Sequence, residues 1–141
     1  MAATLTEMFR EEILQLDGVG RFSPSRRFSS IYRQSDPADR IYFVSAGLIK
    51  VFNRNSSGKA VILRLVAPGE WFGEEALTDS GVRGASAEIL QEAVIFAIPR
   101  TVLASFADRR PAFWPLLAGS LAAQRRQAEI KIEMLCLEDV E

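Results

Sequence analysis

Residues 32–77 read YRQSDPADRIYFVSAGLIKVFNRNSSGKAVILRLVAPGEWFGEEAL, and this stretch decides the fold class. Its apolar runs at 40–47, 48–54 and 59–66 are short and rich in Ile, Val, Phe and Tyr, as β-strands are. The segments between them, QSDPAD, NSSGK and APGE, place Asn, Asp, Pro or Gly where a backbone must turn. Short strands at such regular spacing predict a β-sandwich or barrel, with a jelly roll as the leading choice.

Outside this stretch the same pattern continues and then changes to a helical one. Further strands are predicted in the segments SSIYR, ASAEIL and AVIFAIP, so the β region extends over about residues 22–99. A helix over 4–17 is predicted before it, because the apolar residues of EMFREEILQL fall on one helical side and DGVG then ends the helix. Two helices, at about 101–109 and 112–137, are predicted after it. All 141 residues fit one mainly β domain with flanking helices.

The last predicted helix carries apolar residues on two faces. Leu117, Leu121, Ala128 and Leu135 mark one face, and Ile130, Met134 and Leu137 mark the other. A helix that is apolar on two sides is usually covered on two sides. We therefore expect one face to pack on the β region and the other to form a homodimer through this C-terminal helix.

Composition excludes several functional classes. The chain has no histidine, which removes histidine general bases, most zinc sites and an axial histidine for haem. Cys136 is the single cysteine, so one chain cannot build a disulfide framework or an iron–sulfur cluster, and we expect this thiol to pack within a helix. Seventeen basic and eighteen acidic residues leave almost no net charge, whereas a nucleic-acid-binding domain usually has a basic excess. No apolar run has the length of a membrane span, and a cytoplasmic location is expected.

The segment WFGEEALTDSGVRGASAE, residues 71–88, combines groups that could bind a sugar phosphate. Gly73 allows a sharp bend and a close approach of the backbone to a ligand. EEAL can form one helical turn, whose free N–H groups favour an anion. Arg83 supplies a planar guanidinium suited to phosphate, and Glu74 could accept a hydrogen bond from a sugar hydroxyl. The alternative is a solvated loop in which Glu74 forms an ion pair with Arg83.

Residues from about Phe22 to Val140 resemble the cyclic-nucleotide-binding domain of the Crp/Fnr transcription regulators. The resemblance lies in the stretch quoted first, in VRGASAE and AIPR, and in the terminal LCLEDV. It implies a jelly roll, a short phosphate-binding helix and a long helix that forms a parallel dimer. It also implies that the glutamate of FGE takes the ribose hydroxyl and that the later arginine takes the cyclic phosphate. These roles fall on Glu74 and Arg83.

The resemblance assigns two further sets of residues to the site. Backbone or side-chain contacts to the ligand are expected from Gly73, Glu74, Glu75, Ala76, Arg83, Gly84 and Ala85. A pocket lining is expected from Val51, Leu63, Phe72, Gln124 and Ala128. The implied effector is a cyclic nucleotide, either cyclic AMP or cyclic GMP, and no metal or required cofactor is implied.

The chain departs from the family pattern at three places. Gly84 stands where cyclic-AMP binders usually carry a phosphate-contacting Ser or Thr, and Ala128 and Glu129 stand where the catabolite activator has an adenine-contacting Thr-Ser pair. Ser35 occupies a turn position that is usually glycine. Each lost hydroxyl contact to a charged group costs on the order of 1.5–3 kcal/mol, so we expect weak cyclic-nucleotide binding, another anionic effector or no ligand.

The sequence thus predicts an effector-sensing and dimerisation domain rather than an enzyme. A metal-dependent cupin is also a jelly roll, but cupins hold their metal mostly through histidines. A ligand-free dimerisation scaffold and a stand-alone regulatory module remain as alternatives. Family members continue into a helix-turn-helix domain, which is absent from these 141 residues, and DNA contact is expected only through such a domain.

Overall fold

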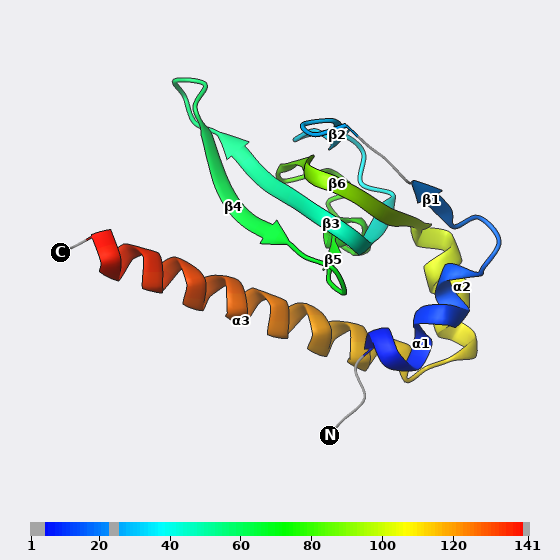
Figure 1. The fold of residues 1–141 in the computed structure, drawn as a ribbon. Helices are drawn as coiled ribbons and strands as arrows, with labels where there is room; N and C mark the ends of the chain where they lie inside the picture. The colour runs from blue at the N-terminus through cyan, green and yellow to red at the C-terminus, as the bar shows by residue number, and fades with distance from the viewer. Residues whose placement is uncertain (1–4, 23–25, 140–141) are drawn as a thin grey trace.

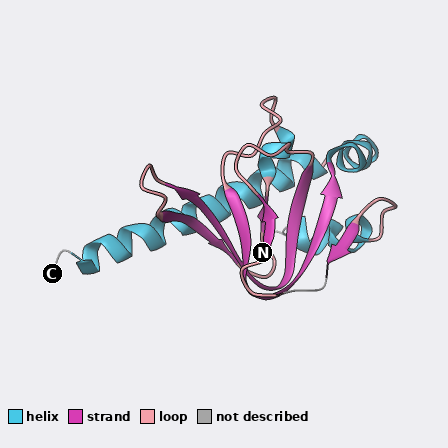
Figure 2. Ribbon diagram, turned by 90° about the horizontal axis from the view of Figure 1, so that it is seen from above, coloured by secondary structure: helices cyan, strands magenta, loops and turns pink. Residues whose placement is uncertain are grey.

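The computed structural model describes the backbone of residues 5–22 and 26–139 and the side chains of residues 9–22 and 26–126. Six strands form one strongly curved antiparallel sheet, with three α-helices gathered along one side of it (Figures 1 and 2). The prediction of a mainly β jelly roll followed by a long C-terminal helix is confirmed. Ala128, Glu129 and Cys136 lie where only the backbone is described, so the predictions for their side chains fall outside this range.

Two long strands form the centre of the sheet. β3 (Arg40–Arg54) and β6 (Ser86–Pro99) pair along most of their length, with β4 (Ala60–Val66) on the outer side of β3. The short strands β1 (Gly20–Phe22) and β2 (Ser30–Tyr32) pair with β6, and β5 (Trp71–Phe72) pairs with β3. Because the sheet curves back on itself, its concave side encloses an apolar interior.

The two strands predicted at 40–47 and 48–54 are one continuous strand in the structure. The pairing of β3 with β6 shifts register three times between Val44 and Ile49, so the strand bends there instead of ending. Gly47 makes the bend possible, because its φ is 89° and a Cβ atom would lie 2.3 Å from the carbonyl oxygen of Glu92. The predicted strands at 85–90 and 93–99 likewise merge into β6.

The helices lie close to the predicted positions. α1 (Leu5–Leu14) ends three residues earlier than predicted, and the chain then turns through Gly18, whose φ is 92°. α2 spans Arg100–Arg109, and α3 spans Phe113–Asp139. α3 starts at the α1–α2 corner and runs below β4 and β5 in the view of Figure 1, with the turn of the β3–β4 hairpin pointing away from it. Among the described residues, no helix combines the length and the apolar character needed to cross a membrane.

Two apolar clusters stabilise this arrangement. The first lies inside the curved sheet and includes Tyr32, Tyr42, Val51 and Phe72. The second lies between the sheet and the helices, where the rings of Phe9, Phe106 and Phe113 meet edge to face. β5 joins the two clusters, because Trp71 belongs to the helix side and Phe72 to the interior. The loop that follows β5 therefore starts from a fixed point.

Candidate functional site

A single 3₁₀ turn, η1 (Glu74–Leu77), follows β5 directly. The predicted helical turn in EEAL is thus present, and Ala76 at its centre is fully buried. Gly73 precedes the turn with a left-handed φ of 78°. A Cβ atom on Gly73 would lie 2.9 Å from both Arg83 Nη1 and the Tyr42 ring, so glycine is needed here for space as well as for conformation.

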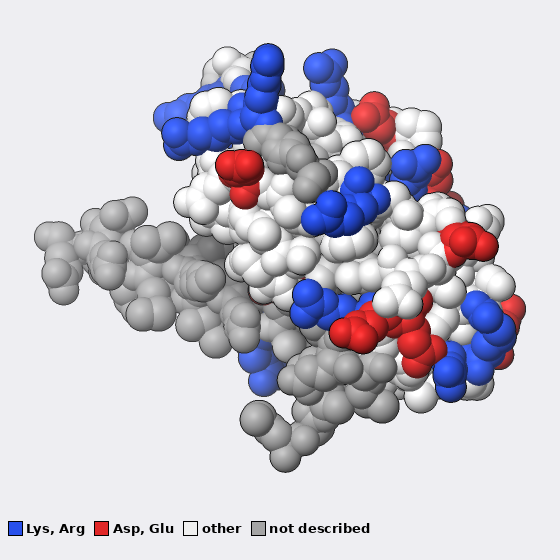
Figure 3. All heavy atoms as spheres, turned by 45° about the vertical axis from the view of Figure 1, so that its right-hand side comes forward, with Lys and Arg blue, Asp and Glu red and all other residues white. Residues whose placement is uncertain are grey.

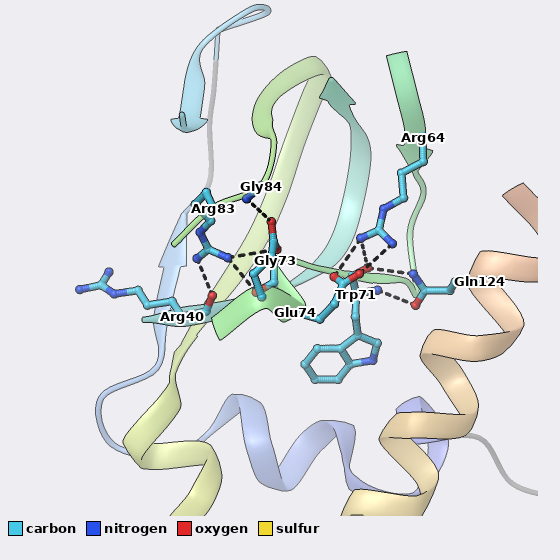
Figure 4. Close-up of polar contacts among 9 residues, drawn as sticks. Arg40, Arg64, Trp71, Gly73, Glu74, Arg83, Gly84 and Gln124 are labelled. Atoms are coloured by element: carbon cyan, nitrogen blue, oxygen red, sulfur yellow. Dashed lines mark hydrogen bonds and ion pairs between the residues drawn. The ribbon is translucent and has the colours of Figure 1, made fainter. Parts of the chain in front are cut away.

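Arg83 is the central charged group of the site. Its exposed fraction is 2 %, and it is the only buried charged residue among those whose side chains are described. Its Nη1 donates to the Gly73 carbonyl at 2.8 Å, and its Nη2 donates to the Arg40 carbonyl at 2.6 Å (Figure 4). The guanidinium also lies 4.1 Å above the ring of Tyr32, a cation–π contact. The structure thus holds the cation rigidly beneath the η1 loop.

Glu75 contacts Arg83, and Glu74 does not. Glu75 Oε1 lies 3.5 Å from Arg83 Nη1, while Glu75 Oε2 accepts a hydrogen bond of 3.2 Å from the Gly84 backbone N–H. Glu75 therefore links the two segments that carry the predicted phosphate contacts. The interpretation of an ion pair between Glu74 and Arg83 is wrong, because the carboxylate one position later takes that place.

Glu74 forms a bidentate ion pair with Arg64 of β4. Its two carboxylate oxygens accept hydrogen bonds of 3.2 and 3.1 Å from Arg64 Nη1 and Nη2, and the second nitrogen also donates to the Trp71 carbonyl. Sequence reasoning did not select Arg64. The only available signal was a lone basic residue in the otherwise apolar strand AVILRLV, and its partner depends on the register that sets Arg64 opposite Val51.

Gln124 fastens α3 to β5. Its side-chain oxygen accepts from the Trp71 N–H and its side-chain nitrogen donates to the Trp71 carbonyl, both at 2.8 Å. Figure 4 shows this amide reaching from α3 to the strand that leads into Gly73. Gln124 is expected from the sequence in a pocket lining; in the structure its side chain pairs with the backbone of Trp71 next to the loop.

The other predicted residues fall into different environments. Val51, Phe72 and Ala85 are all buried in the interior cluster. Leu63 lies at the register shift between β3 and β4 and is 42 % exposed. Gly84 has open space where a Cβ atom would stand. The described residues thus bring Gly73, Glu75, Arg83 and Gly84 together, while Leu63 remains at the outer strand.

The turn before β3 supports the backbone of Arg83. Ser35 adopts a left-handed φ of 76°, a conformation that favours glycine, so the departure noted at this position does place a strained residue in the turn. The Ser35 N–H donates to the Arg83 carbonyl, and the Arg83 N–H donates to the Asp36 carbonyl. The strained turn and the arginine therefore form one hydrogen-bonded unit.

Two tyrosines pack around the buried guanidinium. Burial raises the pKa of Tyr32, and the Glu75 carboxylate raises it further, while Arg83 acts in the opposite direction. Burial also raises the pKa of Tyr42, again against the effect of Arg83. Both phenols, together with Asp36, Arg40 and Arg83, line a pocket of about 310 Å³ on the side of the 36–42 turn. Arg83 thus lies between neutral aromatic rings and carbonyl oxygens.

The site thus consists of a buried arginine beside an η1 turn, within a curved sheet that a long helix flanks. The profile of the cyclic nucleotide-binding domain matches residues 25–110. The chain belongs to this family. Its matching segment contains β2 to β6, η1 and α2, and so includes the whole loop from Gly73 to Ala85.

Individual proteins that the chain resembles include regulators of the Crp type. The chain is 32 % identical over 109 residues to the cyclic AMP receptor protein of Thermus thermophilus, covering 77 % of this chain and 50 % of that protein. It is 28 % identical over 114 residues to a CRP-like cAMP-activated global transcriptional regulator of Mycobacterium tuberculosis, covering 81 % and 51 %. The chain thus spans about half the length of these relatives, and it is a Crp/Fnr-family cyclic-nucleotide-binding domain.

A solved structure agrees with this assignment. The catabolite activator protein of Thermus thermophilus superposes with a TM-score of 0.73 at 29 % identity, covering 96 % of this chain and 64 % of that one. The superposition includes the long C-terminal helix as well as the sheet. The fold and family predicted from the sequence are therefore confirmed.

Proposed function

We propose that this chain is the effector-sensing and dimerisation domain of a Crp/Fnr-type transcription regulator. Its effector is a small anion, with cyclic AMP and cyclic GMP as the first candidates. The observation that carries this proposal is the burial of Arg83. A buried guanidinium is costly unless it is paired, and here two neutral carbonyls and one loosely placed carboxylate are its polar partners among the described residues.

The neighbours of Arg83 suit a phosphate ligand. The Gly84 N–H and the Arg83 guanidinium both contact the Glu75 carboxylate. A phosphate in the place of that carboxylate would accept hydrogen bonds from both groups. Glu74 is the first residue of η1, and it could accept a hydrogen bond from a sugar hydroxyl after exchanging its contact with Arg64. Two relatives are described as a cyclic AMP receptor and as cAMP-activated, which supports the choice of probe.

We also propose that two copies associate through α3. The sequence places a second apolar face on this helix, and the adjacent outer strand β4 is apolar and open. Val61, Ile62, Leu63 and Leu65 of β4 are each more than 40 % exposed. A second copy would remove such surface from water. DNA contact would then depend on a helix-turn-helix domain outside these residues, and the protein would act in the cytoplasm.

A ligand-free dimerisation scaffold is the second candidate. Its specific support is that Glu74 and Glu75 each already contact an arginine, while Gly84 offers no hydroxyl. On this alternative the polar contacts around η1 are structural only. The two candidates differ in a single measurable property, which is binding of an anion at Arg83.

Isothermal titration calorimetry with cyclic AMP and cyclic GMP tests the proposal. Wild type should bind at least one nucleotide in the micromolar to millimolar range, and Arg83→Ala should lose most of the affinity. Arg33→Ala, which removes an exposed guanidinium near the same turn, is the matched control and should bind as wild type does. Thermal unfolding of each variant separates loss of binding from loss of fold. No heat from wild type with either nucleotide at millimolar concentration would leave the scaffold.

A further inference from the structure

Glu75 occupies the position that an anionic effector would need. One carboxylate oxygen accepts from the Gly84 N–H and the other faces Arg83 Nη1. These are two donors that the proposed function assigns to the effector phosphate. A carboxylate and a phosphate oxygen compete for the same donors, because both are anionic acceptors. The site therefore already contains an anion supplied by its own chain.

The geometry makes Glu75 the movable partner of this pair. The Arg83 side chain is 1 % exposed and is held by the Gly73 and Arg40 carbonyls as well as by Glu75. The Glu75 side chain is 28 % exposed, so it can rotate toward water. If Glu75 leaves, the two carbonyls still keep Arg83 in place. Displacement would therefore open the anion position without dismantling the site.

The contact between Glu75 and Arg83 is also looser than an optimal one. Its 3.5 Å separation exceeds the roughly 2.7–2.9 Å of a charge-assisted hydrogen bond. Arg83 Nε is buried and has no hydrogen-bond partner among the described residues. One donor of the guanidinium is thus unused, and the others are satisfied mostly by neutral oxygens. An anion placed closer to the Arg83 guanidinium than Glu75 is would therefore form a stronger hydrogen bond with it.

We propose that Glu75 is an internal competitor that an anionic effector must displace from Arg83 and the Gly84 N–H. This proposal rests on the proposed function and adds a specificity determinant to it. A neutral nucleoside cannot replace the lost carboxylate, so it would not open the site. A ligand with a phosphate can, at the cost of breaking the internal contact. Glu75 therefore lowers the affinity for every ligand and favours anionic ones.

Calorimetry on Glu75→Gln tests this competition. The glutamine keeps the size of the side chain and removes its charge, so cyclic AMP should bind about three- to tenfold more tightly than to wild type. Glu88→Gln is the matched control. It also removes one partly buried acidic charge, that of the Glu88–Lys50 pair on the sheet, and should leave the affinity unchanged. Adenosine should bind no variant.

The outcomes separate this inference from the proposed function. Tighter binding by Glu75→Gln, beside a wild type that also binds, supports both. A variant that binds beside a silent wild type supports the competition at Glu75 and leaves the natural chain as the ligand-free scaffold. Equal or weaker binding by Glu75→Gln, with a wild type that does bind, overturns the competition and leaves the effector site intact. Silence of wild type and of Glu75→Gln with both cyclic nucleotides at millimolar concentration overturns the effector site and the competition together.

The NMR resonance of the Gly84 amide distinguishes displacement of Glu75 from a general effect of the removed charge, because it reports on the hydrogen-bond acceptor of this N–H. Its ¹H–¹⁵N resonance should differ between free wild type and free Glu75→Gln, because its acceptor differs in charge. The two resonances should converge when both proteins are saturated with cyclic AMP, since the phosphate is then the acceptor in each. A Gly84 resonance in wild type that stays unchanged on saturation would show that Glu75 has not been displaced.

Discussion

At the residue scale, the site depends on a guanidinium that the fold can bury only because each neighbour is suited to it. Gly73 leaves room for Arg83 Nη1, two carbonyl oxygens face its N–H groups, and the Tyr32 ring covers its plane. Gly73 and Arg83 could be selected from the sequence, because a glycine allows a close backbone approach to a ligand, a guanidinium suits a phosphate, and both stand in motifs that resemble the family. Arg64 could not be selected in this way, since an arginine in a strand usually faces water and the burial of this one is set by tertiary register.

Gly84→Ser should increase the affinity for cyclic AMP. A serine fits, because nothing lies within 4 Å of the position of its Cβ atom and the backbone there is not left-handed. The added hydroxyl can donate to a phosphate oxygen, and a hydrogen bond to a charged group contributes about 1.5–3 kcal/mol, so a gain of at least about tenfold is expected. Calorimetry checks this value. Gly81→Ser, on the same loop but at a left-handed φ of 66°, is the control and should bring no gain.

The buried phenols predict a loss of stability at alkaline pH. The pKa of Tyr32 and that of Tyr42 are raised in the folded protein above the unfolded value of about 10. Between these values the unfolded chain releases protons that the folded one retains, so the free energy of unfolding falls as pH rises above about 10. Below about pH 10 both phenols are protonated in the folded and the unfolded chain, so they make the free energy of unfolding no further dependent on pH.

Urea unfolding from pH 8 to pH 11.5 measures this effect, and phenolate absorbance follows the ionisation itself. Tyr32→Phe should flatten the alkaline decline, because the variant has one ionisable phenol fewer in the interior. Two results would contradict the assignment of Tyr32 as a buried, neutral group. The free energy of unfolding of the variant could fall with pH as steeply as that of wild type, or phenolate absorbance could appear near the ordinary tyrosine pKa of about 10 while the protein is still folded.

At the element scale, the sequence predicts where the strands lie, but not which neighbouring segments join into one continuous strand. Alternating apolar residues and turn residues locate β3, β4 and β6, because these patterns are local. The fusion of 40–47 with 48–54 depends on how Gly47 packs against the backbone of Glu92 and Ala93, which is a contact across the sheet. The two-residue strand β5 is likewise defined by its pairing with Tyr42 and Phe43, so no window of sequence around Trp71 and Phe72 reveals it.

Gln124→Leu should destabilise the packing of α3 on β5. The leucine has a similar size but cannot pair with the Trp71 N–H and carbonyl, and a partly buried unpaired polar group costs about 1–3 kcal/mol. The free energy of unfolding in urea should fall by that amount. Gln91→Leu, at an exposed position of β6, is the matched control. Equal losses in the two variants would show that the Gln124 amide contributes no specific stability.

At the scale of the whole molecule, charge and apolar surface indicate different partners. The net charge is −1, and acidic side chains lie among the basic ones on the face shown in Figure 3. Such a surface lacks the basic excess that draws a protein to duplex DNA, so these residues alone should show no salt-sensitive nanomolar binding to it. The exposed apolar side chains of β4 and the second apolar face predicted for α3 suit another protein surface instead.

The domain should form a homodimer through α3. Sedimentation velocity at micromolar concentration should show a dimer, because an exposed apolar helix face of about two turns is unfavourable in water. Ile130→Glu places a charge on that face of the helix and should shift the equilibrium toward monomer by at least about tenfold, since burying an unpaired carboxylate costs several kcal/mol. Thr101→Glu, at an exposed position of α2, adds the same charge elsewhere and should leave the dimer intact.

A wild type that remains monomeric at high micromolar concentration would contradict the prediction. Dissociation by both variants alike would show that net charge, and not the α3 face, governs association.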